Sequence, residues 1–228
     1  MKFPIEIKAI AFDLDGTLVE TLPDLHESAL RMLAQLGLPA VPESVVRAYV
    51  GDGVDRLVKR LLTGTPDGEP DAATFEQSAQ AFRSHYASVL TRASHPFADA
   101  VATLEVLRGR GFKLACVTNK PARFTEPLLD GLALTARLDL VLSGDSLARK
   151  KPDPLPLLHV AGAFGIAPSR LLMVGDSPAD TGAARAAGCP VFCVPYGYRG
   201  ALTVQELDCD AIVPTLSDLL DLIKLARS

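Results

Sequence analysis

The chain has 228 residues, of which 48% are hydrophobic, and it carries a net charge of −4. This length allows one large or two small domains with a sizeable core. The negative charge argues against a basic nucleic-acid-binding surface, and no apolar run reaches the length of a membrane span. The N-terminus shows no signal-peptide pattern, and the four cysteines form no CxxC pair. We therefore expect a cytoplasmic protein that binds neither nucleic acid nor membrane.

The first predicted strand is the apolar run Ile7–Phe12, and two carboxylates follow where it ends, in the segment Asp13-Leu-Asp15-Gly16-Thr17. Carboxylates at the mouth of an apolar strand are costly unless a metal, a cation or hydrogen bonds compensate them. Taken alone, Asp-x-Asp-Gly is also typical of an ordinary turn. The rest of the chain favours a functional role.

Residues from about 21 to 92 contain no clear buried strand, and their pattern predicts several helices. Thr21 and Asp24 form a plausible helix start, after which apolar residues recur with helical periodicity as far as Leu36. A Gly/Pro-rich loop lies within this region at 63–70. We interpret 20–93 as a helical domain inserted into a core domain made of 1–19 and 94–228.

Short apolar runs alternate with helical patterns in the remainder of the chain. The predicted strands are Lys113–Thr118, Leu138–Leu142, Leu171–Val174 and Val191–Val194, and the predicted helices are 98–110, 122–132, 154–164 and 178–187. This alternation predicts an α/β fold with a doubly wound, Rossmann-like parallel sheet and the helical cap domain inserted after its first strand.

Polar residues recur where four of these strands end. They are Asp13 and Asp15, then Thr118 and Asn119, then Lys151, and finally Asp176. Ligands of open parallel sheets bind at the carboxyl ends of the strands, so we expect these six side chains to line one crevice. Individually, Thr118 and Asn119 could instead cap a helix, Lys151 could be a surface lysine and Asp176 a turn residue. Four such coincidences at four strand ends favour a site.

The order of these motifs resembles the haloacid dehalogenase superfamily. The matching pieces are Asp13-x-Asp15-Gly16-Thr17, Thr118-Asn119, Lys151-Pro152 and Gly175-Asp176-Ser177-x-x-Asp180. Within that superfamily the chain is most similar to bacterial phosphoglycolate phosphatases, through Val117–Pro121, Gly144–Leu147, Lys151–Leu158, Tyr196–Tyr198 and Val50–Leu57. It departs from them at Glu20, where aspartate is usual, and at Arg199, where asparagine often follows Gly-Tyr.

The resemblance implies a Mg²⁺-dependent phosphatase that works through an aspartyl-phosphate. Asp13 would be the nucleophile, and Asp15 would protonate the leaving group and later activate water. Asp13 and Asp176, together with the Asp15 backbone carbonyl, would hold Mg²⁺, a cation that prefers oxygen ligands.

The resemblance also implies the phosphate-binding groups. Thr118, Asn119 and Lys151 would bind the phosphate, with Lys151 adding positive charge beside the nucleophile. Asp180 would orient the Asp176 loop from outside the ligand shell.

The implied partner is a small phosphorylated metabolite, 2-phosphoglycolate, bound by a monomer or homodimer. The cap would select the leaving group, with Arg47, Arg56 and Lys59 as candidate carboxylate-binding cations. Two alternatives stay open. One keeps the chemistry, as a sugar-phosphate mutase or another small-phosphate or pyrophosphate hydrolase. The other is a phosphorylation-controlled binding module, which the insert and the second aspartate disfavour.

Overall fold

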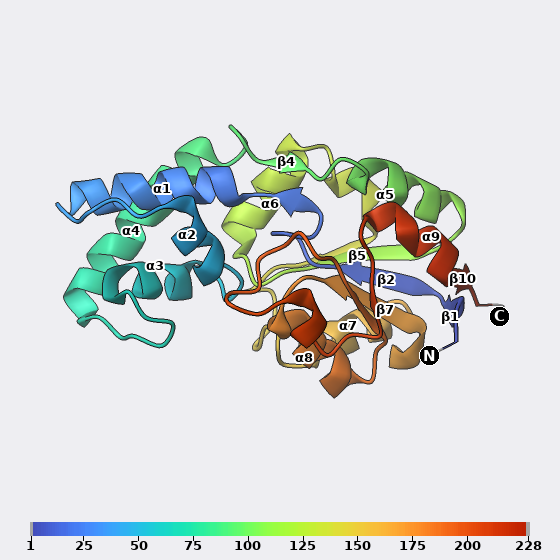
Figure 1. Cartoon of the computed structure of the whole chain (residues 1–228). Coiled ribbons are helices and arrows are strands. Elements are labelled where there is room, and N and C mark those ends of the chain that lie inside the picture. Colours follow the sequence, from blue (N-terminus) through green and yellow to red (C-terminus); the bar gives the residue numbers. More distant parts are fainter. Residues whose placement is uncertain (1, 227–228) are drawn as a thin grey trace.

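The computed structural model describes residues 2–226, with a parallel sheet toward one end and a group of helices at the other (Figure 1). Six parallel strands form the main sheet in the order β6-β5-β2-β7-β8-β9. Their bounds are Leu140–Leu142 (β6), Lys113–Val117 (β5), Ala9–Phe12 (β2), Leu171–Gly175 (β7), Val191–Cys193 (β8) and Ala211–Ile212 (β9). The chain builds outward from β2 first on one side and then on the other. The predicted doubly wound parallel sheet is therefore confirmed.

Helices cover both faces of this sheet (Figure 1). Their bounds are Ala100–Gly109 (α5), Ala122–Gly131 (α6), Leu155–Ala163 (α7), Pro178–Ala187 (α8) and Leu219–Leu222 (α9). Ile10 and Phe12 of β2 pack in the apolar cluster that includes α5 and α6, whereas Ala9 and Ala11 pack in the cluster of α7 and α8. Successive strand residues point to opposite faces, and here both faces are buried. This explains why the strand is continuously apolar rather than alternating.

The predicted first strand, Ile7–Phe12, is in fact two strands with a break at Lys8. The preceding strand β1, Ile5–Ile7, leaves the main sheet and pairs in parallel with β10, Ile223–Leu225. Strands β9 and β10 were not predicted. β9 has only two residues, and β10, with the sequence Ile-Lys-Leu, is not an uninterrupted apolar run. Short 3₁₀ helices occur at Thr135–Arg137 (η1), Pro168–Arg170 (η2), Val204–Glu206 (η3) and Leu216–Asp218 (η4). The other predicted elements of the sheet domain differ from the observed ones by at most two residues at either end.

Four helices lie between β3 and β4 and pack on one another away from the sheet (Figure 1). Their bounds are Leu22–Gln35 (α1), Glu43–Tyr49 (α2), Val54–Thr63 (α3) and Ala72–Val89 (α4). The first helix, α1, starts with Pro23 in its first turn, where the missing N–H is not needed, and is followed by Gly37 at φ +68°. Its buried face contains Leu25, Ala29 and Met32, at the spacing of an amphipathic helix.

Two short antiparallel strands mark where the chain leaves the sheet and returns to it. They are β3, Val19–Glu20, and β4, His95–Pro96. The buried Asp24 carboxylate near the start of α1 accepts hydrogen bonds from the returning segment, at 2.7 Å from the Ser94 N–H and 3.0 Å from the Ala93 N–H. Both connections are thus held side by side, and motion of the helices relative to the sheet has to pivot there.

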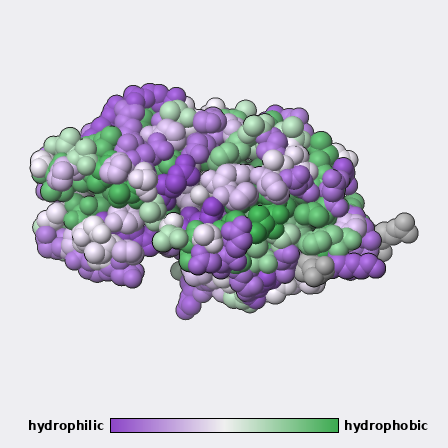
Figure 2. All heavy atoms as spheres, viewed as in Figure 1, coloured by the Kyte–Doolittle hydropathy of each residue, from purple (hydrophilic) through white to green (hydrophobic). Residues whose placement is uncertain are grey.

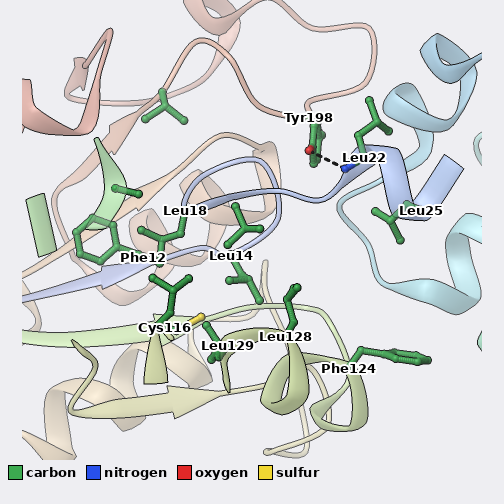
Figure 3. Packing of buried hydrophobic residues seen from close by; sticks show 14 of the residues in the cluster. Phe12, Leu14, Leu18, Leu22, Leu25, Cys116, Phe124, Leu128, Leu129 and Tyr198 are labelled. Carbon is green, nitrogen blue, oxygen red and sulfur yellow. Dashed lines mark hydrogen bonds between the residues drawn. The ribbon is translucent and has the colours of Figure 1, made fainter. Parts of the chain in front are cut away.

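The apolar core continues from the sheet into the helical part. Figure 3 shows Leu22 and Leu25 of α1 near Leu14 and Leu18, which follow the first core strand. On the surface, Figure 2 shows a notch in the lower outline between the helical end and the part that carries the sheet. The two parts therefore share a core on one side and are separated by a groove on the other.

Candidate active site

Asp13 and Asp15 lie directly beyond the carboxyl end of β2, between the ends of β5 and β7. The Asp13 N–H donates to the Val174 carbonyl at 2.9 Å, so this residue continues the ladder toward β7. The chain then turns at Gly16, whose φ is +83° and where a Cβ would come within 2.6 Å of Asp176 Oδ2. A glycine is required for both reasons. The turn therefore brings the aspartates of two neighbouring strands together.

Lys151 is the buried cation of the site. Its Nζ lies 2.8 Å from Asp13 Oδ1 and 2.6 Å from Asp180 Oδ1, and its side chain is only 2% exposed. The contact with Asp13 is an ion pair outside hydrogen-bond geometry, and Asp13 Oδ1 is a buried oxygen without a hydrogen-bond donor. One lysine thus serves two carboxylates.

Carboxylate oxygens of Asp13, Asp176 and Asp180 lie within 4.8 Å of one another, and all three residues are buried. Burial raises the pKa of Asp13 to about 7, against the opposing effect of Lys151. Burial and repulsion from Asp180 and Asp13 also raise the pKa of Asp176 well above its usual range. Negative charge here exceeds the positive charge supplied by Lys151, which is the electrostatic setting of a cation site.

The three carboxylates differ in the bonds they already make. Asp180 Oδ2 accepts hydrogen bonds from the N–H groups of Asp176 and Ser177 and from the Ser177 hydroxyl, at 2.7 to 3.1 Å. This is the capping box of α8, and with Lys151 it engages both oxygens. The predicted orienting role for Asp180 fits these bonds. Asp13, which accepts no hydrogen bond at Oδ1, and Asp176 fit a role as ligands of a hard cation better.

The Asp15 carboxylate lies outside this acidic cluster. It accepts hydrogen bonds from Lys120 Nζ at 2.8 and 3.0 Å, and its Oδ1 also accepts one from the Thr21 hydroxyl at 2.6 Å. Thr21 does occupy the N-cap position of α1, as its predicted place at a helix start implies, but its hydroxyl binds Asp15 instead of capping the helix. Only the backbone carbonyl of Asp15 was assigned to the metal, and that assignment stays a prediction.

Thr118 and Asn119 follow β5 and are buried. Asn119 Nδ2 donates to the carbonyls of Lys151, at 3.0 Å, and of Gly51 in the helical part, at 3.1 Å. Neither residue caps the next helix: the N-cap of α6 is Pro121, and the Asp145 carboxylate binds its first N–H at 2.8 Å. The capping alternative is therefore excluded for both residues.

One pocket brings most of the predicted residues together. It is lined by Asp13, Asp15, Thr118, Asn119, Lys120, Asp176, Ser177 and Tyr198 from the sheet domain, and by Leu25, Val50, Gly51, Gly53, Val54 and Leu57 from the helices. Lys151 does not line it and contacts Asp13 from behind. The pocket is small, with a volume of about 30 Å³, enough for a water molecule or two. The helical part therefore lies closed over the site in this structure.

Two lining residues were not among the predicted site residues. Lys120 directly follows Asn119, and its position just after a strand end was the available signal. The other, Tyr198, donates its backbone N–H to Asp176 Oδ2, and its hydroxyl accepts bonds from the N–H groups of Thr21 and Leu22 at 3.0 and 3.2 Å (Figure 3). No local pattern in the sequence indicates that contact.

The three candidate cations of the helical part do not line the pocket. Arg56 pairs with Asp67 and Glu69, and Lys59 pairs with Glu69, all at the exposed 63–70 loop. The third, Arg47, lies 3.7 Å from Glu20 and stacks on the Tyr198 ring. Arg56 and Lys59 therefore lie outside the pocket, and their position does not fit the predicted role in binding a carboxylate.

Comparison with known proteins fits this geometry. A family model described as haloacid dehalogenase-like hydrolase matches residues 7–188. The chain belongs to the haloacid dehalogenase-like hydrolases. A Thiobacillus denitrificans protein named phosphoglycolate phosphatase is 51% identical, over 95% of both chains. A protein of the same name from Nitrosospira multiformis is 49% identical, over 98% of this chain and 99% of its own.

Among solved structures, a predicted phosphoglycolate phosphatase from Haemophilus somnus superposes with a TM-score of 0.90 at 35% identity, covering 95% of this chain and 97% of its own. The resemblance to the haloacid dehalogenase superfamily is confirmed. The prediction that the chain is a phosphoric monoester hydrolase is confirmed as well. Within residues 2–226, no helix combines the length and apolar character needed to cross a bilayer.

Proposed function

We propose that this protein is a Mg²⁺-dependent phosphatase that hydrolyses 2-phosphoglycolate to glycolate and phosphate through an aspartyl-phosphate at Asp13. The observation that carries the proposal is the buried Asp13–Lys151 ion pair beneath a pocket that Thr118 and Asn119 also line. The names of the relatives that match nearly the whole chain support the choice of substrate.

In the first step, an Asp13 carboxylate oxygen attacks phosphorus and the bond from phosphorus to the leaving oxygen breaks. Lys151 offsets the repulsion between carboxylate and phosphate from 2.8 Å away. The Thr118 hydroxyl and the Asn119 backbone N–H bind the non-bridging oxygens, over which charge spreads in the transition state.

Asp15 lines the same pocket and is the proton donor and acceptor of the proposed reaction. It protonates the departing glycolate oxygen in the first step. In the second step it takes a proton from the water that attacks the aspartyl-phosphate. Catalysis of this kind contributes roughly 10²- to 10⁴-fold in rate. Asp15 has to release at least one bond to Lys120 or Thr21 to reach the leaving oxygen.

Asp13 and Asp176 would hold the Mg²⁺ ion, with the backbone carbonyl of Asp15 as a further oxygen ligand. The excess of buried carboxylate over lysine fits a small divalent cation. When bound, the ion supplies positive charge that reduces repulsion between Asp13 and the phosphate. Asp180 holds Lys151 and the start of α8 in place.

Residues 20–93 form the proposed cap, which excludes water during phosphoryl transfer and selects the leaving group. Its loop at 51–53 contacts the sheet domain beside the phosphate-binding residues. The Gly51 carbonyl accepts a hydrogen bond from Asn119, and the Asp52 carbonyl accepts one from Nζ of Lys150, the neighbour of Lys151, at 2.6 Å.

The test is phosphate release from a panel of metabolites with and without chelator, for the wild type and Asp13→Asn. We expect 2-phosphoglycolate to be preferred and the variant to lose turnover while it keeps its melting profile, because an amide is a poor nucleophile. Equal turnover of hexose phosphates would reject the substrate. Near-normal turnover by a folded Asp13→Asn protein would reject the mechanism.

A further inference from the structure

Lys120 is the only basic residue that lines the pocket within the described part of the chain. Its side chain is 3% exposed, and its ammonium group lies over the ring of Tyr86 in α4, 4.8 Å from the ring centroid. Two of its hydrogen bonds go to the two oxygens of Asp15. A fixed, desolvated cation therefore sits on the leaving-group side of the pocket, against the proton donor.

Among the described residues, no other side chain of the lining is cationic, and the backbone of Gly53 and Val54 at the start of α3 supplies the N–H groups on the cap side. Leu25, Val50, Val54 and Leu57 form the cap side and are apolar. Behind the site, Lys151 is committed to Asp13 and Asp180. A carboxylate carried into this space has to find its cation at Lys120, because an unpaired charge against apolar walls is strongly disfavoured.

We propose that Lys120 is the specificity-determining residue, which binds the carboxylate of the substrate and in exchange releases Asp15 for proton transfer. This rests on the proposed function. Lys120 holds Asp15 through two hydrogen bonds. The carboxylate of a substrate can take the place of the Asp15 carboxylate at the same ammonium group. The freed Asp15 then turns to the leaving oxygen, which in 2-phosphoglycolate is one carbon from the carboxylate. A monoester without an anionic tail leaves Asp15 bound.

The experiment compares 2-phosphoglycolate with 2-hydroxyethyl phosphate, which has the same chain length and no carboxylate. For Lys120→Met we expect kcat/KM to fall roughly 10- to 100-fold on 2-phosphoglycolate, the value of one charge-assisted hydrogen bond. On 2-hydroxyethyl phosphate it should not fall, because the variant no longer holds Asp15 with an ammonium group. Lys120→Arg should recover part of the preference. Lys59→Met, which neutralises a cap lysine outside the pocket, should leave both substrates unaffected.

Binding of the product provides a readout independent of turnover. Glycolate should inhibit the wild type more strongly than ethylene glycol does, and this difference should vanish in Lys120→Met. Hydrolysis of p-nitrophenyl phosphate, whose leaving group needs little protonation, reports whether transfer to Asp13 is intact. If Lys120→Met does not fold, Lys120→Gln is measured in the same way.

The outcomes separate this inference from the proposed function. A wild type without preference for 2-phosphoglycolate overturns the proposed substrate, and the role of Lys120 with it. A wild-type preference that survives in folded Lys120→Met overturns the role of Lys120 alone. An equal loss on both alkyl phosphates, with p-nitrophenyl phosphate spared, would also overturn carboxylate binding and reduce Lys120 to a residue that positions Asp15.

Discussion

At the scale of single residues, the site is a buried excess of negative charge. Asp13, Asp176 and Asp180 meet around Lys151, which pairs with two of them. Moving carboxylates out of water is expensive, so this cluster lowers the stability of the metal-free protein. The same charge excess is what allows a cation to bind, and two predictions follow from it.

The first concerns the metal. Asp176→Asn keeps the shape of the side chain, and its Oδ1 can still accept the hydrogen bond that the Thr17 hydroxyl now makes at 3.0 Å. Because the amide removes an anionic ligand, we expect the Mg²⁺ concentration for half-maximal activity to rise at least tenfold, roughly 1.4 kcal/mol in binding. A metal titration of phosphate release measures it. An unchanged titration curve for the folded variant would show that Asp176 is not a ligand.

The second concerns stability and pH. Burial raises the pKa of Asp13 to about 7, whereas the unfolded chain releases this proton near pH 4. Between these values the native state binds more protons, so the contribution of Asp13 to stability falls as pH rises. In chelator, Asp13→Asn should therefore gain stability relative to the wild type between about pH 5 and about pH 8. Urea unfolding at both values measures the difference.

Added Mg²⁺ is the control for this pH effect. The ion binds the ionised carboxylates, so it should stabilise the wild type more at the higher pH. The difference in unfolding free energy between the wild type and Asp13→Asn should therefore become smaller. If the unfolding free energies of the wild type and Asp13→Asn change with pH in parallel in chelator, the raised pKa of Asp13 is not the cause of the pH effect.

At the scale of elements, the start of α8 is part of the site. The carboxylate of Asp180 closes the capping box with Ser177 and binds Lys151 at 2.6 Å, with no exposed side-chain surface. Helix formation after β7 and placement of the lysine therefore depend on one side chain. A second capping box, Thr215 with Asp218 at η4, is exposed and has no lysine.

This pair of boxes gives a matched test. Asp180→Asn removes the charge that Lys151 faces, and loss of one partner in a buried ion pair costs about 3–5 kcal/mol. Asp218→Asn removes a comparable cap at the surface, where the cost is about 1 kcal/mol or less. Denaturant unfolding of both variants should show the larger loss for Asp180→Asn, together with reduced turnover. Equal losses would mean that the bond to Lys151 adds no stability.

At the scale of the whole molecule, Tyr198 connects the acidic cluster to the hinge, the two chain segments around 19–22 and 93–96 that link the sheet to the helices. Its backbone binds Asp176, and its hydroxyl accepts the N–H groups of Thr21 and Leu22, where the chain passes into α1 (Figure 3). Figure 1 shows that this segment joins the two ends of the molecule. One residue thus contacts both the acidic cluster and the start of the helical part.

Tyr198→Phe removes the hydroxyl and leaves these buried N–H groups without that acceptor, at a cost of about 1–3 kcal/mol. We expect a lower melting temperature and faster proteolysis in the segments around 19–22 and 93–96. Tyr86→Phe is the control, because the buried Tyr86 hydroxyl has no hydrogen-bond partner and its loss should not destabilise. If both variants melt alike, Tyr198 does not hold the hinge.

Much of this protein was predictable because its key residues sit beside strong local signals. Asp13, Thr118 and Asp176 each follow an apolar run, and the parallel sheet brings the ends of such runs to one edge. The orienting role predicted for Asp180 came from the resemblance to a known family. Apolar runs and strand-end polar residues therefore determined the sheet and most of the site.

Contacts between distant segments were decided only by the tertiary structure. Lys120 and Asp15 are 105 residues apart, and Tyr198 meets Thr21 across 177 residues. Such pairs depend on how the helical part packs on the sheet domain. No local pattern around a lysine or a tyrosine indicates which residue it will contact. The sequence by itself determined which polar side chains gather at one edge of the sheet, because strand ends converge by rule. Only the tertiary structure decided that Lys120 lies against Asp15, because that depends on packing between elements rather than on periodicity within one.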